Sequence, residues 1–147
     1  MSNYTQWGKN VIFCGPAQML DQPIRKESPV LAETLPGTVV HLNADGLFEA
    51  GPGSLSYVLD KDHLGHEFVQ TPYEADDIAT AFWPQSGLVL NVLTAATLEI
   101  VEDEPLFITA TGTLTNVDPA DGTAAYGYAA ESLTVGASPE LVAVKFV

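Results

Sequence analysis

The chain has 147 residues, enough for one domain with a hydrophobic core of its own. Hydrophobic residues make up 46% of it, which excludes a disordered chain. The formal net charge is −14, with 5 Lys and Arg against 19 Asp and Glu. Direct binding of nucleic acid is therefore not expected, because phosphate contacts require basic side chains.

The first 36 residues differ in pattern from the rest of the chain. Gly and Pro residues interrupt every periodic run, so neither a long helix nor a long strand is expected there. The segment is either an extension packed on the body or an arm that becomes ordered on a partner. Tyr4 and Trp7 favour the arm, since large aromatic side chains are typical of interfaces. We therefore divide the chain into an N-terminal arm or extension, residues 1–36, and a β-rich domain, residues 37–147.

A β-hairpin is predicted at the start of the second part. Residues 38–41 form a β-branched run, and residues 47–50 form a second run with alternating apolar residues. Between them, Asn43-Ala44-Asp45-Gly46 reverses the chain, because Gly46 tolerates positive φ and Asn and Asp side chains bond to the turn backbone.

Further strand candidates follow at short intervals, separated by Gly, Pro, Asp or Asn. They are residues 56–59, 87–93, 97–101, 105–109, 112–116, 124–130, 133–135 and 140–147. Residues 73–83 are interpreted as a loop with a possible short helix that ends at Pro84. In the last strand, Lys145 is expected to point outward, with Val144 and Phe146 on the opposite face. The spacing predicts an all-β fold, a compact β-sandwich or small barrel with an extended N-terminal arm.

One cluster of metal-type ligands occurs in the sequence. It consists of Asp60, Asp62, His63 and His66. The cluster lacks the H-E-x-x-H spacing that fixes ligands on a helix, so we interpret it as a solvated polar loop between strands.

Other carboxylate groups also lack the spacing of a reaction centre. Residues 118–122, DPADG, have Pro and Ala where a calcium loop needs oxygen ligands, and are interpreted as a turn. Residues 102–104 are interpreted as a charged loop, because adjacent carboxylates diverge. With no nucleophile elbow or phosphate-binding loop, no catalytic, metal or cofactor site is predicted, and an enzyme is not expected.

Targeting signals are not apparent either. The first ten residues lack the features of a signal peptide, and polar residues break the longest apolar stretch, residues 87–101. Cys14 is the single cysteine, so it forms no intrachain disulfide and is interpreted as a small apolar residue. We expect a protein that is made in the cytoplasm and does not enter a membrane.

Three segments together resemble a known family. They are PGTVVHLNADGLFEA from residue 36, EPLFITATGTLTN from residue 104, and AAYGYAAESLTVGASPELVAVKFV at the end. They resemble the small β-rich capsid decoration, or cement, proteins of tailed bacteriophages. Residues 60–86 depart from that family's pattern.

The resemblance implies a virion protein that binds the outside of the mature icosahedral head and bridges major capsid subunits. It implies a homotrimer at local threefold positions, with an N-terminal arm that becomes ordered on the capsid lattice. The implied lattice contacts are Tyr4, Trp7, Val11, Ile12 and Phe13. Deletion of residues 2–16 is then expected to abolish binding while the β domain stays folded.

Two alternatives remain open. One is a phage tail or fibre subunit, which would be expected to assemble into rings or tubes alone. The other is a carbohydrate-binding β-sandwich module, with Trp7, Trp83, Tyr57 or Tyr73 as a stacking platform for sugars.

Overall fold

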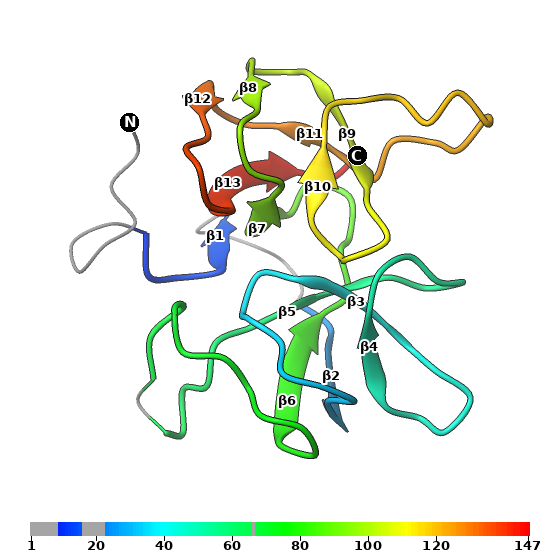
Figure 1. The fold of residues 1–147 in the computed structure, drawn as a ribbon, viewed down its shortest axis with the longest axis vertical. Helices are drawn as coiled ribbons and strands as arrows, with labels where there is room; N and C mark the ends of the chain where they lie inside the picture. Colours follow the sequence, from blue (N-terminus) through cyan, green and yellow to red (C-terminus); the bar gives the residue numbers. More distant parts are fainter. Residues whose placement is uncertain (1–8, 16–22, 66) are drawn as a thin grey trace.

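The computed structural model describes residues 9–15, 23–65 and 67–147. Within these residues every regular element is a β-strand, so the prediction of an all-β fold is confirmed. The strands form two small barrels stacked on one another, and the barrel built mainly from the N-terminal half of the chain lies below the other in Figure 1. The described residues contain no helix long and apolar enough to cross a bilayer.

The first barrel is built mainly from the N-terminal half of the chain. Its strands lie in the order β2 (Arg25–Pro29), β6 (Ile78–Phe82), β5 (Tyr57–Leu59), β3 (Val39–Leu42) and β4 (Phe48–Ala50). An isolated bridge joins Val30, the residue directly after β2, to Phe48 of β4, and Leu31 N–H donates to the Phe48 carbonyl at 2.9 Å. This bridge closes the sheet.

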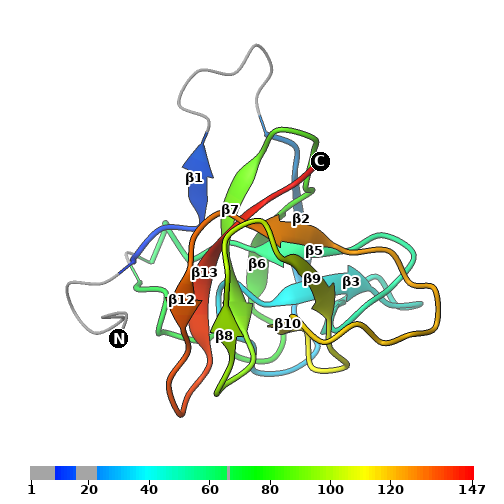
Figure 2. The same cartoon turned by 90° about the horizontal axis from the view of Figure 1, so that it is seen from above.

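The second barrel is built from the C-terminal half. Its strands lie in the order β7 (Val89–Thr94), β10 (Leu114–Thr115), β9 (Pro105–Ile108), β11 (Gly127–Ala129) and β13 (Glu140–Lys145). The pairing of β13 with β7 closes this barrel. Strand β1 (Phe13–Gly15) adds to β7, and β8 (Glu99–Ile100) pairs with β12 (Leu133–Thr134) in a separate ribbon, seen beside each other in Figure 2.

Strands in the wall between the barrels are buried on both faces. In β3, Val40 packs inside the first barrel. Val39 points to the other side, where it packs in the core of the second barrel and in the contact between the two barrels. In β5, Leu59 likewise packs inside the first barrel and Val58 in the core of the second. The alternation of side chains along a strand thus supplies two cores at once, and the two barrels form one packed unit.

Backbone hydrogen bonds also join the barrels, at two glycines. Gly37 N–H donates to the Leu59 carbonyl at 2.7 Å, and Leu93 N–H donates to the Gly37 carbonyl at 2.9 Å. Gly112, at the turn between β9 and β10, accepts from Val39 N–H at 2.7 Å. Both glycines have positive φ, and a Cβ on either would approach an atom of the opposing segment to about 2.5 Å (Leu141 Cδ2 for Gly37, the Val39 carbonyl oxygen for Gly112).

The predicted hairpin is confirmed. Strands β3 and β4 pair antiparallel, and Gly46 has a φ of 76°. The Asn43 Oδ1 atom accepts hydrogen bonds from the backbone N–H groups of Asp45 and Leu47, each at 3.0 Å. The later strands also form near the predicted positions, and each is shorter than its predicted range.

One prediction differs from the structure. Residues 73–83 contain β6 in place of the possible short helix, and the turn before it is closed by Glu74 N–H donating to Asp77 Oδ2 at 2.9 Å. The segment is a strand because β6 lies between β2 and β5, so non-local pairing outweighs the local helical signals. In residues 1–36, the described residues form only the short strands β1 and β2, in line with the expectation of no long strand there. Pro29 is accommodated as the last residue of β2.

Candidate functional site

Residues 9–15 carry three of the five predicted capsid contacts, and Tyr4 and Trp7 lie outside the described residues. Val11 is 50% exposed, whereas Ile12 is 1% exposed and belongs to the main core. Phe13 is partly buried, and its ring lies 6.2 Å from the ring of Phe82. Of these three side chains, Val11 offers the most surface to another protein.

The same segment is tied to both barrels. Asn91 on β7 donates from its side chain to the Val11 carbonyl and from its backbone N–H to the Ile12 carbonyl, each at 2.7 Å. From the other side, the Lys61 Nζ atom donates to the Asn10 carbonyl at 2.8 Å. Lys9 forms an ion pair with Glu131. Residues 9–15 are thus a packed extension of the body in this conformation.

This packing argues against one expectation about the deletion of residues 2–16. That deletion would remove Ile12 from the core and β1 from its pairing with β7, so the β domain is not expected to stay intact. A deletion limited to residues 2–8 removes Tyr4 and Trp7 and leaves these contacts in place. The role of the five residues in capsid binding stays a prediction.

The Asp60 cluster lies in a loop, as the sequence suggests, and His63 is exposed there, but Asp60 itself is buried. Asp60 follows β5 and is 2% exposed, with its carboxylate accepting from Lys61 N–H at 2.8 Å and lying 3.2 Å from His63 Nε2. Burial raises the pKa of the Asp60 carboxyl, opposed by the Lys61 N–H and by His63. Asp62 accepts from Gly65 N–H at 2.9 Å, and His66 is outside the described residues. No group of three or more metal-type ligands is gathered among the described residues.

The other carboxylate groups singled out in the sequence lie in loops, where several of them accept hydrogen bonds or form an ion pair. Asp118 Oδ1 accepts from Ala120 N–H at 2.8 Å, which confirms the predicted turn between β10 and β11. Glu104 closes its own loop by accepting from Val101 N–H at 3.1 Å, and Asp103 forms an ion pair with Lys145.

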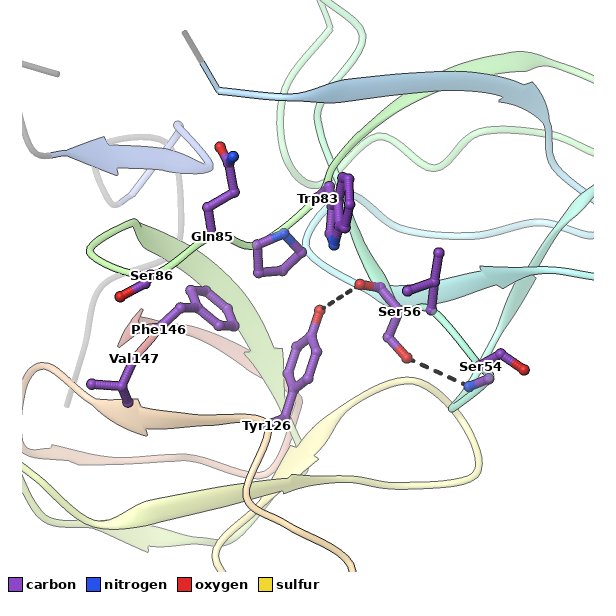
Figure 3. Close-up of a pocket in the computed structure, with 11 residues that line it drawn as sticks. Ser54, Ser56, Trp83, Gln85, Ser86, Tyr126, Phe146 and Val147 are labelled. Atoms are coloured by element: carbon purple, nitrogen blue, oxygen red, sulfur yellow. Dashed lines mark hydrogen bonds between the residues drawn. The ribbon is translucent and has the colours of Figure 1, made fainter. Parts of the chain in front are cut away.

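An open cleft of about 310 Å³ lies where the two barrels meet (Figure 3). Four separate segments line it. They are residues 53–56 before β5, residues 83–86 between β6 and β7, Tyr126 before β11, and residues 146–147 after β13. Sequence reasoning missed this cleft, apart from naming Trp83 as a possible stacking residue, because no local pattern brings these segments together.

The walls of the cleft are held in place by backbone and ring contacts. Tyr126 donates from its hydroxyl to the Ser56 carbonyl at 3.2 Å, and its ring meets that of Phe146 edge to face at 5.3 Å. Burial strongly raises the pKa of the Tyr126 hydroxyl, which therefore stays neutral and remains a donor. Figure 3 shows Tyr126 between Ser56 and Phe146, with its hydroxyl directed to the loop of the first barrel.

Trp83 forms part of the cleft directly after β6. Its backbone N–H donates to the Ile24 carbonyl at 2.9 Å, which extends the pairing of β2 with β6 by one residue. The side chain is not covered by this pairing, and the residue is 41% exposed. The cleft thus combines a fixed backbone with an accessible indole ring.

The sequence matches no protein-family model and no curated protein. Among solved structures, the fold is similar to that of the N base of head fibre gp8.5 in bacteriophage phi29. The TM-score is 0.53 and the sequence identity is 15%, and the likeness covers 86% of this chain and 95% of that chain. The two chains therefore share a fold across most of their lengths.

Proposed function

We propose that this chain is a structural protein of a phage head that binds the outer surface of the capsid. One observation carries the proposal: both barrels match a chain described as the base of a head fibre, over 95% of that chain. The resemblance of the sequence to capsid decoration proteins independently supports binding to the outside of a phage head. In this role the protein is a binding module and not an enzyme.

The finer form of the proposal is a decoration, or cement, protein that bridges major capsid subunits as a homotrimer. Two barrels that share a wall and are joined by backbone bonds make a rigid body, which suits a protein that clamps its neighbours. Repetition of the site over the lattice would let modest contacts hold strongly. The net charge of −14 supports a protein partner over nucleic acid.

A second candidate is the capsid-anchoring base of a head fibre. The observation that favours it is the description of the matching structure, which is itself a fibre base. Both candidates share attachment to the head exterior, and they differ in whether the bound protein carries a projecting fibre.

The test is co-sedimentation of the purified chain with mature heads stripped of accessory proteins, and with unexpanded heads as control. We expect saturable binding to mature heads, with three copies per occupied position for the trimer. Val11→Asp is expected to weaken binding. Val117→Asp is the matched control, because Val117 is similarly exposed in the loop after β10. Absence of binding to both kinds of head would overturn the proposal.

A further inference from the structure

We infer that the cleft between the barrels is a binding site for a neutral oligosaccharide. The inference goes beyond attachment to the head, and it can be tested without any capsid. It rests on the chemistry of the side chains that line the cleft, on the exposed Trp83, and on a second hollow beside the cleft.

The charge of the cleft differs from that of the protein. The chain carries 19 acidic residues, yet none of the described side chains that line the cleft is acidic or basic. The polar side chains that line it are hydroxyls and an amide, those of Ser54, Ser56, Ser86, Gln85 and Tyr126. A phosphate or a carboxylate would find no cationic side chain there to pair with. Groups of this kind instead exchange hydrogen bonds with neutral hydroxyl-rich ligands.

Trp83 supplies the apolar surface that a sugar requires. One face of a pyranose ring presents mainly C–H bonds, and these carry a slight positive charge that is attracted to the negative face of an aromatic ring. Trp83, a residue that is 41% exposed and whose backbone is fixed by its hydrogen bond to Ile24, offers such a face. The cavity of about 310 Å³ lies at the lower end of the range for ligand pockets, which fits one or two sugar rings.

A second hollow favours an oligomer over a single sugar. It has a volume of about 510 Å³ and shares the segment 53–55 with the cleft, so this segment forms a ridge between the two. The described side chains that line it include the imidazole of His41 but no carboxylate, Lys or Arg. Its hydroxyl and amide side chains, like those of the cleft, are Asn43, Ser54 and Tyr57. A chain of sugars that crosses the ridge would contact both hollows.

The test uses the full chain and isothermal titration with hexamers of glucose and of N-acetylglucosamine as probes. We expect saturable binding of at least one neutral hexamer, weaker binding of its dimer, and no binding of oligogalacturonate, which is anionic. In a Trp7→Phe background, Trp83 is the single tryptophan, and its fluorescence is expected to change on binding. Because the readout is direct, failure of this test would leave the proposal of head attachment standing.

Variants of the cleft sharpen the test. Trp83→Ala is expected to weaken binding about tenfold, and Trp83→Phe to weaken it less, because stacking depends on the aromatic face. Phe68→Ala is the matched control, since Phe68 is exposed but does not line the cleft, and it is expected to bind as the unmodified chain does. Equal binding by Trp83→Ala, or no binding of any neutral hexamer, would overturn the inference. The inference would also be overturned if the chain self-associates and Trp83→Ala dissociates it, because the cleft would then be an interface between copies.

Discussion

Gly112 shows how single residues hold the two barrels together. At a φ of 81°, it lies where an added Cβ would come within 2.4 Å of the Val39 carbonyl oxygen. Gly122 has a similar φ of 84°, but an added Cβ there would meet nothing within 4 Å. Substitution of both glycines therefore separates two costs of an added Cβ: backbone strain, which both positions share, and the clash with a neighbouring atom, which only Gly112 has.

We predict that Gly112→Ala lowers the free energy of unfolding by about 2–4 kcal/mol, as strain and a clash with fixed backbone combine. Gly122→Ala is expected to cost about 1 kcal/mol, from strain alone. Urea unfolding of both variants measures the difference. Equal losses would show that the turn at Gly112 can move away from β3 without cost.

Asp60 makes a prediction about pH. Because burial raises the folded-state pKa of this carboxyl, its contribution to stability is present below its unfolded pKa and is lost as pH rises through the folded value. Asp60→Asn keeps an oxygen that can accept from Lys61 N–H and removes the titration. The variant is therefore expected to gain thermal stability relative to the unmodified chain as pH rises from about 3 to about 7. A relative loss that grows with pH would mean that the pair with His63 outweighs burial.

At the scale of elements, β1 shows how firmly a short strand can be fixed. It has three residues, and the segment that leads into it is secured by Asn91, by Lys61 and by the burial of Ile12. The stability of the fold therefore depends on a segment that the sequence pattern assigns to an arm or extension.

We predict that Ile12→Ala lowers the free energy of unfolding by about 2–5 kcal/mol, the usual cost of emptying a buried Ile site. Val11→Ala, its exposed neighbour, is expected to change stability by less than about 0.5 kcal/mol. Thermal unfolding of both variants makes the comparison. A small effect of Ile12→Ala would mean that residues 9–15 leave the body at little cost and behave as an arm.

The elements that could be predicted from sequence are those with local causes. The β3–β4 hairpin follows from the turn chemistry of Asn43 and Gly46, which acts over five residues. Strands β2 and β6 could not be predicted in this way, because each is a strand through pairing with the other. Nor could the cleft, since its four lining segments are far apart in the chain and meet only when the barrels pack.

For the whole molecule, the division into two barrels was not predictable either. A strand with one buried face shows clear alternation, but β3 and β5 face two cores, and consecutive apolar residues (Val39-Val40 and Tyr57-Val58-Leu59) hide that alternation. The predicted all-β class is right because class depends on strand spacing and composition. The arrangement depends on which distant strands pair.

The central claim is attachment to the outside of a phage head, and cryo-electron microscopy of mature heads saturated with the purified chain tests it most directly. We predict density for both barrels on the outer surface, at local threefold positions, with the side that carries Val11 against the shell. Heads without added density, or density confined to the tail or to the interior of the shell, would contradict the account.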